Sequence, residues 1–299
     1  MKMLLLRLMA RLPLPLLHGL GIVLAWLIWR WHGKNRRKLL TTLNQSGLAE
    51  QHPGLLRRVI HETGKGMLEL PAIWLRPHSK VVDLVRETPG LEQFDAALQA
   101  GKGVVVVAPH IGCWEIINQY IAARQPFTAM YKPARQPFVD NLMRHGRERG
   151  QARLVPTDLS GVKALLGALK RGEAIGVLPD QVATQGDGVW APFFGRWAYT
   201  PTMTVRLIHS TGATPFMVYA ERLSWGRGYR IHFDALSAPL PKERFDAASA
   251  LNREVENVVR KLPAQYMWAY ARYKKPGGVE APPEIEPGRA KAPPDTPAA

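Results

Sequence analysis

His110 and Glu115 are the two residues whose types and spacing are best suited to chemistry. Four residues separate them in the string VVVVAPHIGCWEII. A near-neutral imidazole is a competent general base, and a carboxylate on its second ring nitrogen fixes the tautomer and stabilises the imidazolium that forms. The same spacing also suits a structural arrangement, in which His110 bonds a strand-end carbonyl and Glu115 favours a helix N-terminus. The pair is therefore a candidate general-base dyad.

The elements around this pair decide whether the two side chains can meet. Residues 104–108 form a continuous apolar run, which predicts a strand buried on both faces, and residues 114–122 have a helical pattern. His110 then lies on the turn, and Glu115 reaches back toward it from the first turn of the helix. Cys113 in the same turn offers a rival nucleophilic mechanism. A lone cysteine at a helix start is more typical of packing, which we expect here.

The rest of the chain continues this alternation of helices and short apolar runs. We predict helices within residues 54–76 and over 94–99, 137–149, 161–171, 201–211 and 245–262, and strands over 127–131, 152–155, 174–178, 215–222 and 228–233. Such alternation indicates an α/β fold with a mixed, mostly parallel central sheet flanked by helices. Chemistry in such folds lies at the carboxyl ends of the strands.

The N-terminal region combines an apolar stretch with much of the excess charge. The 299-residue chain carries 40 Lys plus Arg against 24 Asp plus Glu, a net charge of +16, and residues 1–60 hold ten of the basic residues beside a single acid, Glu50. Residues 12–29 carry no formal charge, and this run is near the lower length limit of a membrane span. Basic residues beside an apolar stretch favour an anionic membrane surface, whereas a basic cluster alone fits nucleic acid equally well. The segment predicts a membrane-anchoring helix that either spans the bilayer or lies shallowly in it.

Three regions follow from these patterns. We predict an N-terminal membrane anchor with its basic flank over residues 1–38, a catalytic domain over 39–275, and a disordered Pro/Ala-rich tail over 276–299. No small-residue cleavage site follows the apolar stretch, so we expect it to stay attached. If it spans, the five basic residues from 30 to 38 outnumber the three before it and keep the domain in the cytoplasm. The single cysteine excludes a disulfide scaffold.

Five collinear segments resemble the glycerolipid acyltransferase superfamily, and in particular its branch for late acylation of lipid A. They are PHIGCWE, which contains the His-x-x-x-x-Glu motif, MYKPARQPFVDNLMRHGRER, LPDQ, APFFG continuing to YTP, and NRE continuing to PAQYMW. The resemblance extends from the N-terminal anchor to about residue 276. It implies a membrane-bound O-acyltransferase with the glycerolipid acyltransferase fold.

The resemblance also implies the reaction partners and the site. The acyl donor would be acyl-acyl carrier protein and the acceptor a hydroxyacyl chain of a lipid A precursor, at the inner membrane with the catalytic domain facing the cytoplasm. Neither a metal nor a cofactor is implied. His110 would be the base and Glu115 its orienting partner, with Arg147 and Asp180 as further active-site residues. With the neighbouring residues of these segments and the cation cluster described below, the substrate-binding candidates are Lys132, Arg147, Arg149, Asp180 and Gln181. Two departures from the family pattern, Lys132 in place of Arg and Val182 in place of an acid, affect the choice of acceptor most.

Two further groups of side chains fit this interpretation in part. A phosphorylated glycolipid or an acidic carrier protein needs positive charge near the site. A cluster of cations follows the candidate dyad and could supply it: Lys132, Arg135, Arg144, Arg147 and Arg149. About half of them, Arg144 above all, are expected to form a solvated helix face. Four aromatic residues (Trp190, Phe193, Phe194 and Trp197) suit an acyl channel, although each alone is more typical of a core.

Two alternative functions remain open from the sequence. An acyltransferase of this type could act on a lysophospholipid or an amino-acid lipid, because the dyad activates any suitably placed hydroxyl or amine. A basic protein without catalytic activity could instead bind membranes or nucleic acid. The apolar anchor beside the charge favours a membrane, so we expect no nucleic-acid partner, and a buried strand that ends in His110 is unexplained by binding alone.

Overall fold

Seven strands form the central sheet of the computed structural model, which describes residues 2–284. Their order is β1-β9-β8-β2-β5-β3-β4. The bounds are β1 Val85–Glu87, β2 Val104–Val107, β3 Phe127–Tyr131, β4 Ala152–Pro156, β5 Ala174–Val177, β8 Thr214–Arg222 and β9 Tyr229–Ala235. All neighbouring pairs are parallel except β8 and β9, which are antiparallel. The predicted α/β class with a mixed, mostly parallel sheet is confirmed.

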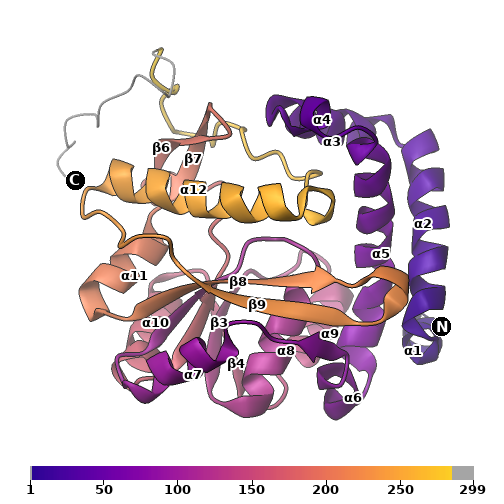
Figure 1. Ribbon diagram of the computed structural model, residues 1–299, viewed down its shortest axis with the longest axis horizontal. Helices are drawn as coiled ribbons and strands as arrows, with labels where there is room; N and C mark the ends of the chain where they lie inside the picture. Colours follow the sequence, from indigo (N-terminus) through magenta and orange to yellow (C-terminus); the bar gives the residue numbers. More distant parts are fainter. Residues whose placement is uncertain (1, 285–299) are drawn as a thin grey trace.

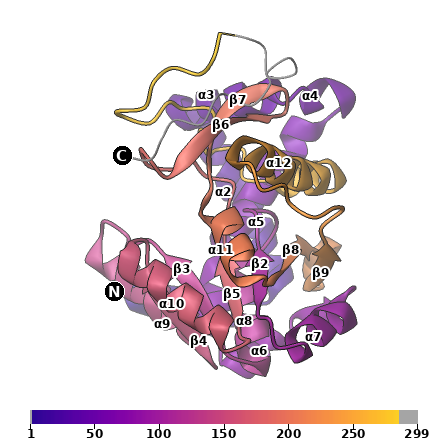
Figure 2. The ribbon, with the colours of Figure 1, turned by 90° about the vertical axis from the view of Figure 1, so that its left-hand side faces the viewer.

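Helices cover both faces of this sheet (Figures 1 and 2). One face packs against α5 (Leu55–Leu75), α7 (Leu91–Gln99), α8 (Trp114–Arg124) and α9 (Pro137–Arg147). The other packs against α10 (Leu159–Lys170), α11 (Met203–Thr211) and α12 (Arg244–Lys261). The α/β layers therefore enclose two apolar cores, one on each side of the sheet.

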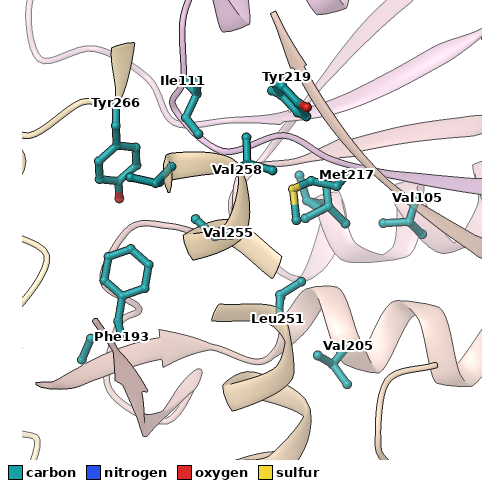
Figure 3. Close-up of a cluster of buried hydrophobic side chains, with 14 of the residues drawn as sticks. Val105, Ile111, Phe193, Val205, Met217, Tyr219, Leu251, Val255, Val258 and Tyr266 are labelled. Atoms are coloured by element: carbon teal, nitrogen blue, oxygen red, sulfur yellow. The ribbon is translucent and has the colours of Figure 1, made fainter. Parts of the chain in front are cut away.

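The strand β2 lies at the centre of both cores. All four of its valines have no exposed surface, because β5 and β8 pair with its two edges and helices cover its two faces. Figure 3 shows one of these faces: Leu251, Val255 and Val258 of α12 lie in one cluster with Val105 and Met217 of the sheet. A run of β-branched residues with no polar alternation is what such a doubly covered strand requires.

The N-terminal helices form a separate layer at one end of the sheet. Figure 1 shows α2 (Leu14–Trp31) on the outside and α5 between it and the sheet. The two helices approach closely at two glycines, since a Cβ on Gly21 would lie 2.4 Å from the carbonyl oxygen of Gly64. Within the described residues, α2 is the one helix long and apolar enough to cross a membrane.

Several elements had no counterpart in the sequence predictions. The hairpin of β6 (Gly188–Phe193) and β7 (Arg196–Pro201) packs on α12 and buries Phe193 and Phe194, so these two rings belong to the core. Other unpredicted elements are β1, α1 (Lys2–Arg11), α3 (Gly33–Gln45), α4 (Leu48–Gln51), α6 (His78–Val82) and the 3-10 helices η1 (Ser224–Gly226) and η2 (Pro263–Gln265). The boundary predicted after residue 38 falls within α3. Of the tail predicted to be disordered, residues 285–299 lie outside the described part, and 276–284 contain no helix or strand.

Candidate active site

His110 lies in the loop that follows β2, at the carboxyl edge of the sheet. Its neighbour across the edge is Asp180, which follows the adjacent strand β5. The connections that leave β2 and β5 pass over opposite faces of the sheet, and the crevice outside such a strand pair is where open α/β sheets bind ligands. The backbone therefore brings these two residues together at the position that the fold favours for chemistry.

Two hydrogen bonds join His110 to Asp180. The imidazole Nδ1 lies 2.7 Å from Oδ1 of Asp180, and the backbone N–H of His110 donates to Oδ2 at 2.9 Å. Burial of the Asp180 carboxyl opposes its ionisation, but the charge of His110, these hydrogen bonds and the charge of Arg272 together lower the pKa of this carboxyl. An ionised Asp180 accepts a proton-bearing Nδ1, which leaves Nε2 of the neutral ring with its lone pair.

The second ring nitrogen of His110 lies beside Gln181. Its Nε2 lies 3.2 Å from the side-chain amide nitrogen of Gln181, and the ring packs edge-on against Trp114, with centroids 5.0 Å apart. The His110 side chain is 12% exposed, so part of the ring reaches solvent. A substrate hydroxyl can take the place of the Gln181 amide at this nitrogen.

Glu115 does not occupy the position predicted for it. Its carboxylate is buried in the first turn of α8, where Arg147 of α9 binds both oxygens and the indole nitrogen of Trp74 donates to Oε2 at 3.1 Å. Burial opposes ionisation of this carboxyl, but Arg147 and Trp74 outweigh it, and the pKa of Glu115 is lowered. The prediction that Glu115 bonds the second ring nitrogen of His110 is wrong, because the fold offers that nitrogen the carboxylate of Asp180. Glu115 still influences His110 through its charge.

The predicted substrate-binding cations separate into three kinds. Arg147 is engaged by Glu115. Arg149 donates to the carbonyls of Ile73, Arg76 and Gly146 and to Gln119, so its guanidinium ties α5 to α8 and α9 instead of facing a substrate. Lys132 is exposed directly after β3, at the same edge of the sheet as His110, and no side chain among residues 2–284 pairs with it. Arg144, expected on a solvated face, forms an exposed pair with Glu148.

Arg272 is a residue of the site that sequence reasoning missed. It is 1% exposed and donates only to neutral acceptors: the Tyr199 carbonyl, Thr200 and Asn252. Its charge supports the ionised form of Asp180. The one signal available was an arginine within the apolar and aromatic run AYARY, which on its own does not distinguish a buried cation from a surface one.

The site loop, residues 109–113, is held on both sides by distant segments. Cys113 N–H donates to the Ala220 carbonyl of β8 at 2.9 Å, and Met267 N–H donates to the His110 carbonyl at 3.1 Å. Gly112 has a φ of +59° and a Cβ there would collide with the Ala220 carbonyl, so only glycine fits. The first N–H groups of α8, at Trp114 and Glu115, have no intrahelical acceptors and form a donor pair beside the loop.

Cys113 lies in the core, as expected. It is 2% exposed, and burial raises the pKa of its thiol well above the ordinary value, which disfavours the nucleophilic thiolate. We expect Cys113→Ala to keep acyl transfer within about twofold of the unchanged protein and to lower the free energy of unfolding by about 1 kcal/mol. Steady-state rates and urea denaturation check this result, and loss of activity in a folded variant contradicts it.

Metal binding finds no support in the described residues. Between residues 2 and 284, no group of three or more His, Cys, Asp or Glu side chains could hold an ion. The site contains a histidine base that a buried carboxylate orients, and it lies beside the first N–H groups of a helix. These groups suit an enzyme that transfers a group to a hydroxyl or amine. Together with the resemblance in five sequence segments, the fold and this site indicate the class of the acyltransferases.

Comparison with known proteins identifies the family within that class. Residues 1–275 match the model of the bacterial lipid A biosynthesis acyltransferases, and the chain belongs to this family. It is 26% identical to the lipid A biosynthesis lauroyltransferase of Escherichia coli K12 over 279 residues, which cover 91% of this chain and 90% of that protein. It is also 26% identical to the palmitoleoyltransferase of the same organism, over 76% of this chain and 73% of that protein. A phosphatidylinositol mannoside acyltransferase of Mycobacterium tuberculosis H37Rv is 30% identical over 54% of this chain and 52% of that protein.

Proposed function

We propose that this enzyme transfers a fatty acyl chain from acyl-acyl carrier protein to a hydroxyacyl chain of a lipid A precursor, with His110 as general base. The observation that carries the proposal is the orientation of His110. Its Nδ1 is held by buried Asp180, which leaves Nε2, 3.2 Å from the Gln181 amide nitrogen, as the nitrogen that can take a proton. Membership of the lipid A acyltransferase family supports the nature of the acceptor.

The proposed reaction needs no covalent acyl-enzyme. His110 Nε2 removes the proton from the acceptor hydroxyl, and the oxygen attacks the carbonyl carbon of the acyl thioester. The tetrahedral oxyanion collapses with cleavage of the C–S bond, and the imidazolium returns the proton to the leaving thiolate. An ester and a free thiol are the products, and His110 is neutral again.

The start of α8 is suited to stabilise the oxyanion. Its first N–H groups, at Trp114 and Glu115, follow the site loop directly, and a preorganised donor of this kind contributes about 2.7–4 kcal/mol to the transition state. Arg147 is not available for this role, because Glu115 already occupies its guanidinium in a bidentate ion pair. We therefore assign the oxyanion to the backbone of α8.

The exposed cations beside the site suit an acidic donor or a phosphorylated acceptor. Lys132 and Arg135 follow β3 at the carboxyl edge of the sheet and are exposed. Exposed positive charge of this kind increases the association rate of an acidic carrier protein and provides hydrogen-bond donors for phosphate. We propose that these two side chains receive such partners at the mouth of the site.

We further propose that the exposed face of α2 binds the inner membrane from the cytoplasmic side. One face of α2 packs on α5 and buries Leu17, His18 and Gly21, whereas Leu16, Leu20 and Val23 on the other face are 48%, 47% and 58% exposed. Exposed cations that suit an anionic leaflet lie on α1, α2 and α3: Arg7, Arg11, Arg30, Arg36, Arg37 and Lys38. Because α2 keeps one face on α5, it meets lipid with the other.

Replacing apolar residues on this face tests the membrane proposal. We expect Leu16→Glu with Leu20→Glu to weaken binding to anionic phospholipid vesicles about 100-fold, since each buried leucine contributes about 1.5 kcal/mol or more. Sedimentation with vesicles measures the partition. Leu159→Glu is the matched control, because this leucine is 80% exposed on α10. Equal vesicle binding by the double variant and the control would exclude the α2 face as the lipid contact.

Mass spectrometry of lipids from a strain that lacks this protein tests the acceptor. We expect a lipid A that is lighter by one secondary acyl chain, because the transfer to a hydroxyacyl chain no longer takes place. Restoring the gene returns the mass, and a copy with His110→Ala does not. An unchanged lipid A accompanied by an altered phospholipid or amino-acid lipid would establish the alternative acceptor instead.

A further inference from the structure

A network of buried polar groups connects α2, α5 and β8 beneath the site loop. Glu69 of α5 is 1% exposed, and Arg222 at the end of β8 is 6% exposed. The Arg222 guanidinium binds both Glu69 oxygens at 2.7–2.9 Å. His18 of α2 lies 3.2 Å from the same carboxylate, and the Tyr229 hydroxyl donates to it at 2.9 Å. The mechanism proposed above uses none of these groups.

The charge of Arg222 keeps Glu69 ionised in this apolar surrounding. Burial opposes ionisation, but Arg222 and the hydrogen bond from His18 outweigh it and lower the pKa of Glu69 to about 2. A buried ion pair contributes little net stability compared with well-packed apolar residues of similar volume. Its retention at this place therefore needs a reason other than stability.

Arg222 makes two further side-chain contacts, an ion pair of Nη1 with Glu62 at 3.3 Å and a hydrogen bond to the site loop, and the second supplies that reason. Its Nη2 donates to the carbonyl oxygen of Gly112 at 2.7 Å, and Gly112 lies between His110 and the start of α8. The Gln265 side chain binds the backbone N–H and C=O of Arg222, and Gln265 also accepts the Gly112 N–H through its own carbonyl. The planar, multi-donor guanidinium is what allows one side chain to hold Glu69 and Gly112 together.

We propose that Arg222 is a positioning residue: it fixes the Gly112 carbonyl, and through it the His110 ring and the first N–H groups of α8, while Glu69 and His18 hold Arg222 in place. The network also ties α2 to the site loop, so that helix and site form one unit. This inference rests on the proposed active site. A shift of about 1 Å in such a loop is enough to slow the reaction by about 100-fold.

Arg222→Lys is the variant that separates positioning from packing. The ammonium keeps a positive charge for Glu69 but cannot also replace the fork that reaches Gly112. We expect kcat to fall about 10- to 100-fold and KM to change less than about twofold, since the lost interaction orients groups that act in the transition state. Amide deuterium uptake over residues 110–114 rises in the same variant.

Glu221→Gln is the matched control. Glu221 is the neighbour of Arg222 on β8, faces the other side of the sheet and pairs with Arg230 and His232 at 3.0 and 3.1 Å. The Glu221→Gln variant loses a carboxylate–arginine pair that does not contact the site loop. We therefore expect kcat and the deuterium uptake over residues 110–114 to stay at the values of the unchanged protein. If Arg222→Lys does not fold, His18→Ala replaces it, with the same rise in uptake expected on a smaller scale.

The two measurements distinguish the failure of this inference from failure of the proposed function. The positioning role is overturned if Arg222→Lys has the same kcat and the same deuterium uptake over residues 110–114 as Glu221→Gln. If Arg222→Lys does not fold and His18→Ala takes its place, unchanged deuterium uptake in His18→Ala overturns the positioning role. An unchanged protein that transfers no acyl group contradicts the proposed function instead. Deuterium uptake still tests the link between Arg222 and the loop in that case, because it does not depend on turnover.

Discussion

Acyl transfer falls by about 10²–10⁴-fold when His110 is replaced by alanine, since general-base catalysis contributes a factor of this size. The alanine side chain cannot accept the proton of the attacking hydroxyl, and water at pH 7 is a far weaker base than an imidazole. The loss appears in kcat, because Nε2 is required only when the proton is transferred. Purified protein with an acyl thioester and a lipid A precursor, measured by product mass, gives the rate.

A second histidine provides the control for this result. His209 on α11 forms no hydrogen bond with a described side chain of the site. Its Nε2 lies 2.8 Å from the carbonyl oxygen of Pro241. We expect His209→Ala to transfer acyl chains at the normal rate. Both variants remain folded and bind vesicles as before, because α2 is unchanged. A His110→Ala protein with near-normal turnover would remove His110 from the mechanism.

Asp180→Asn is the second substitution with a large expected effect, a loss of about 10³–10⁴-fold in kcat. The asparagine amide no longer supplies two acceptor oxygens to Nδ1 and the backbone N–H of His110. The ring then favours the other tautomer, in which Nε2 carries the proton and cannot act as a base. The buried charge of Arg272 also loses its nearby carboxylate, so the variant is less stable than the unchanged protein.

Nitrogen NMR of labelled histidine distinguishes the two candidate carboxylates directly. In the unchanged protein we expect the His110 signal of the Nδ1–H tautomer, and in Asp180→Asn that of the Nε2–H tautomer. Glu115→Gln leaves the tautomer as it is, because Glu115 bonds Arg147 and Trp74 and not the ring. The reverse pattern would restore Glu115 as the orienting partner.

Local sequence signals were enough for the secondary elements around the site. Four consecutive valines ending before Pro109 predict β2, and the helical pattern from Trp114 predicts α8, because both follow from the burial of residues that are neighbours in the chain. The hairpin of β6 and β7 was not predicted, since its burial depends on contact with α12, which begins more than forty residues further along. A resemblance in five segments likewise indicated the family, which the match over residues 1–275 confirms.

Local sequence signals could not determine which carboxylate bonds His110. Local spacing favours Glu115, which is five positions from His110, whereas Asp180 is seventy positions away in sequence but places Oδ1 2.7 Å from the His110 Nδ1. Strand order decides this, since β5 and not a sequence neighbour lies beside β2. The cation cluster after the dyad likewise indicates Arg149 as a substrate-binding residue, whereas in the fold its guanidinium donates to the carbonyls of Ile73 and Arg76.

Residue types and their local spacing, in contrast, follow from the sequence alone. The sequence by itself determined that an imidazole follows a buried strand, that a helix starts four residues later, and that an apolar N-terminal stretch lies beside a basic one. Only the tertiary structure decided which carboxylate orients His110, which cations are free, and that Arg222 reaches the site loop. The reason is physical: periodicity reports burial along one segment, whereas hydrogen bonds between buried charges depend on which segments the sheet brings side by side.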